Sequence, residues 1–367
     1  MKNWIGLTLA LCLMGCSSDD PQTEASDTPQ VQSFVAIGED LENVYQYTFD
    51  AASETGSSIS LTSELGIAPN YLTLRQIEDF LSFYTFSNGS FSLATKSLGS
   101  GAVGSNPNFY TATSDKSITW GINSEAKVYF GYFDPFGSRN LGILEMDLDG
   151  ANEKDTTIDF NVEAAYQPFL YDGILYVSFK DNLGNYKLAT YNTFEGALGP
   201  VLNFGTVPFS FLISEDGDLA VFKYEAEPLL EFYDAKSLTF LENRTLDRNF
   251  GFALGPVSDA FLVADKLYFN IIYPQPSRFA SGPAIYDTNT QEITLPDLFG
   301  RGNEVEQELG QSIQLTTQVY SVSKEVFLIG YATLGTEVLG GVMQMSPEGE
   351  LLGNVTMPFF PNYFVRD

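Results

Sequence analysis

Short apolar segments recur along most of the chain, each about five to eight residues long and rich in Phe, Tyr, Val, Ile and Leu. Clusters of Gly, Asn, Asp and Pro separate them, a pattern typical of β-strands joined by tight turns. Clear examples are the segments 174–180, 219–224 and 266–271. After residue 32 no stretch predicts a convincing amphipathic helix, because the best candidate, 302–311, is short and polar. The pattern therefore predicts an all-β fold.

A two-residue signature follows most of these strands. An aromatic residue or Met comes first, and a turn-forming polar residue then starts a hairpin into another strand. The copies, one of them degenerate, are Phe49-Asp50, Lys96-Ser97, Met146-Asp147, Tyr191-Asn192, Tyr233-Asp234, Tyr286-Asp287 and Met345-Ser346. They lie 42 to 59 residues apart, and a period near 50 residues with about four short strands is typical of a β-propeller blade. Seven copies predict a single propeller of seven four-stranded blades. A six- or eight-bladed ring and an open β-sandwich array are the alternatives.

The two ends of the chain predict how the ring closes. Pro69-Asn70-Tyr71 and Pro361-Asn362-Tyr363 introduce similar apolar segments, which we interpret as innermost strands. The last strand would then join three strands from the start of the folded region. The segments concerned are 363–365 at the C-terminal end and 34–37, 44–49 and 57–62 at the start. A blade built from both ends leaves no unpaired inner edge, which protects a sheet protein from aggregation. The propeller domain is predicted over residues 32–367.

The first residues have the composition of an export signal. A cationic start, Met1-Lys2-Asn3, precedes an apolar run over 4–14 that ends at Gly15-Cys16. The run is too short to span a hydrocarbon core of about 30 Å, so it predicts a signal peptide over residues 1–15. Leu13-Met14-Gly15-Cys16 resembles the bacterial lipobox, in which the cysteine thiol is acylated. We therefore expect Cys16 to carry the lipid; an ordinary cleaved signal with a chance cysteine is the alternative.

Residues 16–31 predict an acidic tether. They are rich in Ser, Asp, Thr, Pro and Gln and cannot bury enough apolar surface to fold. Ser17-Ser18-Asp19-Asp20 resembles the acidic signal that directs lipoproteins of the Bacteroidota to the outer face of the outer membrane. Together with the strand repeats, the leader and tether resemble the β-propeller-type cell-surface lipoproteins of that group. The resemblance implies a lipid-anchored protein that faces the cell exterior and captures a ligand or partner, in some members beside an outer-membrane transporter.

Charge and missing residue types exclude several functions. The chain has 47 acidic and 18 basic side chains, a formal net charge of −29, which would repel nucleic acid. It contains no His, which removes Ser-His-Asp and Cys-His nucleophilic systems and every His-bearing zinc site. Its only cysteines are Cys12 and Cys16, so the folded domain has no disulfide. No cofactor is predicted and no metal, since the segment 147–152 departs from the EF-hand pattern and is typical of a hairpin turn.

Four long loops predict one candidate binding surface. In a propeller, the second-to-third loops and the loops between blades share one face, and the longest loops of this sequence occupy such positions: 134–140, 274–282, 300–311 and 333–340. They and their flanks contain three of the seven arginines and several aromatic residues, Phe133 among them. The candidate ligand-binding residues are Arg139, Arg278, Arg301, Tyr132, Phe136, Tyr273 and Phe279. Arginines beside aromatic rings suit a carboxylate-, catecholate- or sugar-bearing ligand. Surface arginines that pair with the abundant acids are the simpler alternative.

Binding is the predicted function, because the usual nucleophile and acid–base systems are missing. We expect a surface-displayed module that captures a small ligand or a protein partner on the long-loop face. A carboxylate-dependent glycan-active enzyme, a glycoside hydrolase or lyase, is one alternative and would need two carboxyl groups about 5 to 9.5 Å apart in a pocket. A structural subunit of an envelope complex is another.

Overall fold

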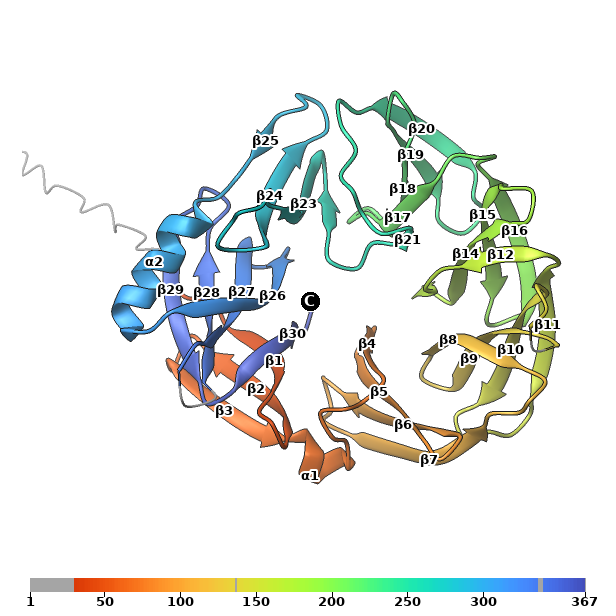
Figure 1. The fold of residues 1–367 in the computed structure, drawn as a ribbon, viewed down its shortest axis with the longest axis horizontal. Helices are drawn as coiled ribbons and strands as arrows, with labels where there is room; N and C mark the ends of the chain where they lie inside the picture. Colours follow the sequence, from red (N-terminus) through yellow and green to blue (C-terminus); the bar gives the residue numbers. More distant parts are fainter. Residues whose placement is uncertain (1–29, 136, 336–338, 367) are drawn as a thin grey trace, which may run out of the picture.

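The computed structural model describes residues 30–135, 137–335 and 339–366, which form a ring of seven β-sheets around a central axis (Figure 1). The predicted all-β propeller with seven blades is confirmed. The predicted leader, Cys16 and most of the tether lie outside the described residues. Within the described part, no helix is long and apolar enough to cross a membrane.

Each blade runs from an inner strand at the axis to an outer strand at the rim. Blade 1 is β30 (Phe360–Phe364), β1 (Phe34–Glu39), β2 (Val44–Asp50) and β3 (Thr55–Ser60). Blade 2 is β4 (Thr73–Ile77), β5 (Phe80–Ser87), β6 (Ser90–Ser97) and β7 (Val103–Thr111). Blade 3 is β8 (Ser117–Asn123), β9 (Lys127–Phe133), β10 (Leu141–Asp147) and β11 (Lys154–Asp159).

Blades 4 and 5 each have an irregular inner edge. In blade 4 the inner strand is split into β12 (Val162–Ala165) and β13 (Phe169–Tyr171), followed by β14 (Ile174–Asp181), β15 (Tyr186–Asn192) and β16 (Ala197–Asn203). Blade 5 has β17 (Phe209–Ile213), β18 (Asp218–Lys223), β19 (Leu229–Asp234) and β20 (Phe240–Thr245), with β21 (Gly255–Pro256) added in parallel inside β17.

Two further blades complete the ring. Blade 6 is β22 (Phe261–Val263), β23 (Lys266–Ile272), β24 (Ser281–Asp287) and β25 (Ile293–Thr294). Blade 7 is β26 (Ile313–Ser321), β27 (Val326–Thr333), β28 (Gly340–Met345) and β29 (Leu351–Met357). The second and third strands of a blade are buried almost throughout, as in β14 and β28, because both of their faces pack against neighbouring blades. Outer strands such as β20 are mostly exposed.

The predicted closure of the ring is confirmed. β30 pairs antiparallel with β1, with Ala36 opposite Phe364, and the bond from Val365 N to Val35 O (3.0 Å) continues the ladder. The observed strand begins three residues earlier than the predicted 363–365 segment. Aromatic packing reinforces this contact, since the ring of Phe34 meets that of Phe364 edge-on at 6.3 Å.

The repeated two-residue signature has a structural cause. Its two residues lie at the end of the third strand, and the first of them is buried between blades, as Tyr191, Tyr286 and Met345 are with no exposed surface. The polar residue that follows accepts hydrogen bonds from the next turn. Asn192 Oδ1, for example, accepts from the backbone N–H groups of Phe194 and Glu195, both at 3.0 Å. Each copy therefore combines a core contact with a turn cap.

Two helices interrupt the β-structure of the described residues, α1 (Leu61–Leu65) and α2 (Leu298–Leu309). The expectation that 302–311 forms no substantial helix is wrong, because α2 has twelve residues, with Asp297 accepting from Gly300 N (3.0 Å) at its start. Its buried stripe holds only Leu298, Gly302 and Val305, and a glycine in the stripe weakens the apolar pattern. At Gly302 a Cβ atom would lie 2.9 Å from the Phe279 ring, so a larger side chain would separate the helix from the sheet.

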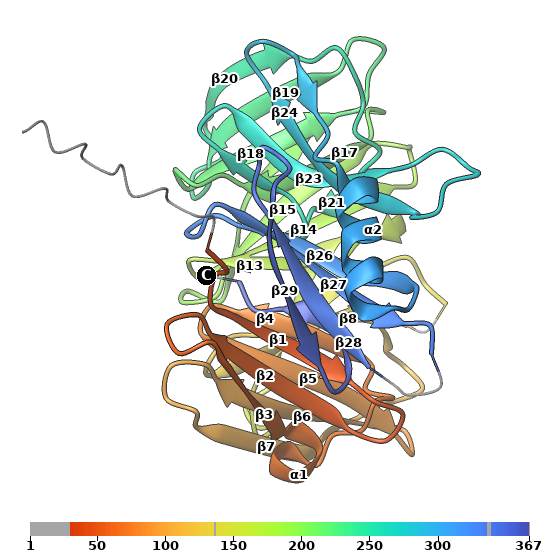
Figure 2. The same ribbon diagram turned by 90° about the vertical axis from the view of Figure 1, so that its left-hand side faces the viewer.

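The two faces of the ring differ. The loops between second and third strands, together with α2, lie on what we call the long-loop face, and the short turns lie on the opposite hairpin face (Figure 2). The chain enters β1 and ends after β30 on the hairpin face (Figure 2). Both ends of the described chain thus lie away from the long loops.

Candidate functional site: the central channel

The axis of the ring is occupied by two adjoining cavities, of about 500 and 430 Å³. The first borders Ile272 and Ser281 at the long-loop ends of β23 and β24, and we call it the upper cavity. The second, the lower cavity, borders Tyr363 and Arg366 near the hairpin face. Both are lined by the same five residues at their junction, which are Pro256, Ser258, Asp259, Thr317 and Gln318. They form one channel through the described part of the ring.

The segment between β20 and β22 gives the channel its shape. It runs inward from the rim and adds β21 inside blade 5, so that its residues line both cavities (Figure 1). Gly255 permits this path, because its backbone has φ +97°, a conformation that disfavours side chains. A Cβ atom there would also lie 3.0 Å from Ser178 Oγ of blade 4.

Arg75, on β4, belongs to the wall of the lower cavity. Its Nε donates to the carbonyl oxygen of Gly121 (2.9 Å) and its Nη2 donates to Gln167 Oε1 (2.6 Å). Both acceptors are neutral, and burial lowers the pKa of the guanidinium below its usual value. An arginine remains charged even so, which leaves a cation held in the wall by neutral groups.

Arg366 follows the last strand and reaches the same cavity. A side-chain amide of blade 2 clamps its backbone: Gln76 Oε1 accepts from Arg366 N (2.8 Å), and Gln76 Nε2 donates to Arg366 O (2.8 Å). The guanidinium lies 5.8 Å from the ring centroid of Tyr363 and 5.9 Å from that of Phe261. Its Nε is buried and has no hydrogen-bond partner among the described residues.

Carboxylates are scarce in this channel. Asp259 is the one acidic residue among those that line the two cavities, and it forms no ion pair with Arg75 or Arg366 in the described chain. Gln318 lies at the junction of the cavities, and its buried Oε1 has no hydrogen-bond partner among the described residues. The channel thus offers unused hydrogen-bonding capacity and two cations in a strongly acidic protein.

Of the predicted site residues, four gather around α2. The Arg278 guanidinium pairs with Glu306 of the helix and lies 4.7 Å from the ring centroid of Phe279. Arg301 pairs with Glu304 (2.6 Å) and donates from Nε to Gly349 O (2.9 Å). Tyr273 and Phe279 both pack against Phe299 of α2. Arg301 is part of α2 and Arg278 pairs with it, and this helix lies at the outside of the ring (Figure 1). Acids match the charges of both arginines.

The remaining predicted residues lie elsewhere. Arg139 is exposed on the β9–β10 loop, across the ring from α2 (Figure 1), so the structure does not gather the three arginines into one mouth. Tyr132 is buried, with Lys116 Nζ 4.7 Å from its ring centroid, and burial raises the pKa of its hydroxyl. Phe136 and Cys16 lie outside the described residues. A ligand-binding role for any of these side chains stays a prediction.

Sequence reasoning missed Arg75 and Arg366. The available signal was a lone arginine in the apolar segment that follows Pro69-Asn70-Tyr71, interpreted as an inner strand, and a second arginine directly after the predicted last strand. Charged residues at such positions border the axis, whereas the longest loops lie toward the rim.

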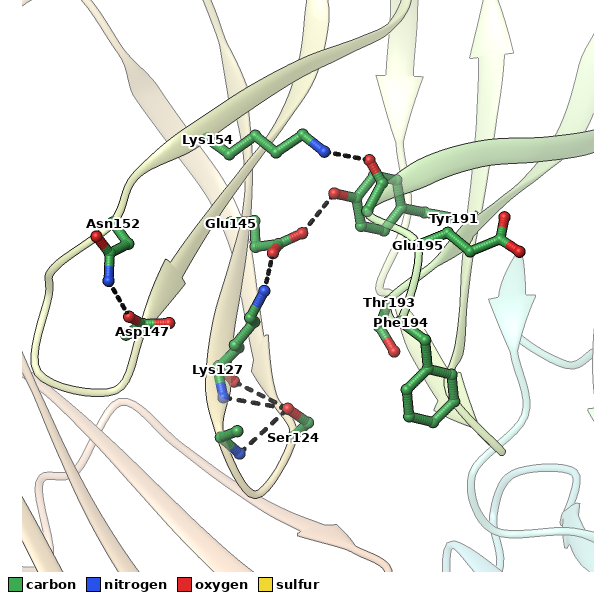
Figure 3. Close-up of polar contacts among 12 residues, drawn as sticks. Ser124, Lys127, Glu145, Asp147, Asn152, Lys154, Tyr191, Thr193, Phe194 and Glu195 are labelled. Atoms are coloured by element: carbon green, nitrogen blue, oxygen red, sulfur yellow. Dashed lines mark hydrogen bonds and ion pairs between the residues drawn. The ribbon is translucent and has the colours of Figure 1, made fainter.

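A cluster of reactive residue types on the hairpin face has a structural explanation. Glu145 of β10 is buried, and one carboxylate oxygen pairs with Lys127 while the other accepts from the Tyr191 hydroxyl at 2.5 Å (Figure 3). Burial and this carboxylate raise the pKa of the Tyr191 hydroxyl. Lys127 belongs to blade 3 and Tyr191 to blade 4, so the carboxylate links two blades. Each of its oxygens is engaged, which argues against a free catalytic acid.

The described residues contain no group of three or more His, Cys, Asp or Glu side chains that could hold a metal ion. In the predicted hairpin turn after β10, Asp147 Oδ2 accepts from Asn152 Nδ2 (2.6 Å) and Asp149 Oδ1 accepts from Ala151 N (2.9 Å). The acids of this turn therefore cap the turn itself (Figure 3).

Comparisons with known proteins show the fold. No family model matches the chain, and no curated protein matches its sequence. Among solved structures, a puromycin hydrolase superposes with a TM-score of 0.52 at 12% identity, over 89% of this chain and 52% of that one. TolB from Acinetobacter baumannii is similar with a TM-score of 0.38 at 13% identity, over 91% of this chain and 82% of that one. AztD from Citrobacter koseri is similar with a TM-score of 0.42 at 12% identity, over 91% of this chain and 98% of that one. At these identities the likeness concerns the β-propeller fold alone.

Proposed function

We propose that this protein is a lipid-anchored binding module of the cell surface that takes a small ligand into its central channel. The observation that carries the proposal is the pair of adjoining cavities on the axis, which has the size typical of small-molecule sites, about 300 to 1,000 Å³. Their lining combines apolar side chains such as Leu74 and Val319 with a comparable number of polar ones. Polar groups in a concave site orient the ligand that the cavity buries.

The geometry of the ends supports display of the upper cavity. A lipid on Cys16 would attach through the predicted tether to residue 30, and the described chain enters the ring on the hairpin face (Figure 2). The long-loop face would then point away from the membrane. A ligand would approach the channel from that side, past Ile272 and Ser281.

The channel favours binding over glycan hydrolysis. Glycoside hydrolysis requires two carboxyl groups that flank the scissile bond. Asp259 alone supplies a carboxyl group to the described channel lining. The absence of His from the sequence removes the usual general base as well.

A filled channel tests the proposal. Ser258 is exposed and lines both cavities, so Ser258→Trp should occupy the channel without a large effect on the fold. Leu241→Trp, at an exposed position of the outer strand β20, is the matched control. We expect native mass spectrometry, after incubation with growth medium or cell extract, to detect a small molecule on the wild type and on Leu241→Trp. The Ser258→Trp variant should lose it; equal retention by all three proteins would contradict a channel site.

A further inference from the structure

We infer that the ligand of the channel carries an oxyanionic group, a carboxylate or a group of similar shape, which binds between Arg75 and Arg366 in the lower cavity. The inference rests on the proposed function, because it names the chemistry of that site. The fold brings the two arginines together, although they lie far apart in the sequence. Gln76, the neighbour of Arg75 on β4, clamps Arg366 from 290 positions away in the sequence.

The ion pairs of the seven arginines are the first evidence for an anion site. Four of the seven arginines, at positions 244, 248, 278 and 301, form ion pairs with acids. Arg75, Arg139 and Arg366 have no carboxylate partner in the part of the chain that the structure describes, and of these Arg139 is exposed to water. The described lining of the lower cavity holds these two arginines and one acid, Asp259, which pairs with neither of them. This lining is therefore net positive within an acidic molecule, and a positive wall attracts anions.

The N–H groups of Arg75 and Arg366 that have no hydrogen-bond partner are the second evidence. Arg75 uses Nε and Nη2 for neutral acceptors, so the N–H groups of its Nη1 have no partner among the described residues. Arg366 has a buried Nε without a partner, and its guanidinium is supported by the rings of Tyr363 and Phe261. A guanidinium held in this way presents N–H groups in a fork that matches the oxygens of a carboxylate. The Nη1 group of Arg75 is not among the buried unsatisfied atoms, so its N–H groups are open to an anion in the cavity.

Asp259 tests whether the charge of the ligand is negative. It borders the junction of the cavities, where its Oδ2 accepts from Asn270 Nδ2 at 3.5 Å. A carboxylate there opposes entry of an anion by like-charge repulsion. Its removal should therefore strengthen binding of an anion, whereas a purely structural role of the arginines gives no reason for such a gain.

The experiment is calorimetric titration of the full mature protein in detergent with sodium succinate and, separately, sodium sulfate. We expect Arg75→Gln and Arg366→Gln to weaken binding by about tenfold or more each, since each removes charge-assisted hydrogen bonds. Arg75→Lys keeps the charge and should retain more affinity than Arg75→Gln, and Asp259→Asn should bind more tightly than the wild type. Lys236→Gln removes a positive charge from an exposed ion pair on the hairpin face and should bind as the wild type does. If succinate binds and sulfate does not, the site is specific for a carboxylate. If both bind, it is a general oxyanion site.

Several outcomes would overturn the inference. Wild-type affinity in both arginine variants, with unchanged thermal unfolding, would place the anion elsewhere. Arg366→Gln should fold, because the clamp by Gln76 engages only the backbone of residue 366. If neither anion binds while the wild type still holds a neutral molecule that Ser258→Trp loses, the anion inference fails and the proposed function stands. If that molecule is also missing, both fail.

Discussion

At the scale of single residues, buried tyrosines connect the blades of a domain that has no disulfide. The Tyr84 hydroxyl donates to Asn123 Oδ1 of the next blade at 2.7 Å, and the Tyr286 hydroxyl donates to Asp247 Oδ1 at 2.8 Å. Burial and the Asp247 carboxylate raise the pKa of Tyr286 to about 12. These phenols stay protonated, and so remain donors, over the whole physiological pH range.

The contact between Tyr191 and Glu145 provides a residue-scale test. Tyr191→Phe leaves a buried carboxylate with one partner fewer, so we expect the free energy of unfolding to fall by about 2 kcal/mol. Urea denaturation followed by fluorescence measures the change. The control is Tyr171→Phe, because the Tyr171 hydroxyl makes no hydrogen bond to the described part of the chain and its loss should change stability by less than about 0.5 kcal/mol. Equal effects of the two substitutions would mean that the carboxylate needs no second donor.

At the scale of elements, β30 closes the ring and also brings the end of the chain to the channel. The strand itself pairs with β1, whereas the residues after it are fixed by β4 of the neighbouring blade through Gln76. The Tyr363 hydroxyl adds a third bond to the same side chain, at 3.1 Å to Gln76 Oε1. One amide therefore couples the closure of the ring to the position of Arg366.

Gln76→Leu tests this coupling. The substitution leaves a backbone donor and acceptor of residue 366 unpaired, so we expect a loss of about 1–3 kcal/mol in the free energy of unfolding. Hydrogen exchange should become faster after residue 360, with little change in the strands of blades 3 to 5. Gln314→Leu, on an exposed position of β26, is the control and should leave exchange unaltered. Protection of 360–366 equal to that of the wild type would show that β30 holds the tail without the clamp.

At the scale of the whole molecule, both ends of the described chain lie on the hairpin face, and the long loops lie on the other (Figure 2). The net charge of −29 disfavours contact between the domain and an anionic membrane surface. Attachment through an N-terminal lipid agrees with both features, because it holds the domain without requiring surface contact.

Lipidation supplies the whole-molecule prediction. Cys16→Ala should remove the acyl group and release the protein from the membrane fraction, which mass spectrometry of the N-terminal peptide and cell fractionation would show. Cys12→Ala changes the other cysteine, within the predicted leader, and should leave the lipid on Cys16. Membrane association of Cys16→Ala at the wild-type level would contradict the predicted anchor. Protease treatment of intact cells would then show whether the long-loop face is displayed outside.

The sequence by itself determined the propeller, its seven blades and its closure. The responsible signals are local: a buried residue such as Tyr191 and a turn cap such as Asn192 are neighbours in the chain, so each blade repeats them in readable form. The tertiary structure decided the channel. Arg75 and Arg366 share a cavity only because the ring brings the inner strands of blades 1 and 2 together, and no local pattern encodes that proximity. The tertiary structure also placed Arg139 away from α2. The helix itself was not predicted, because Gly302 interrupts its apolar stripe.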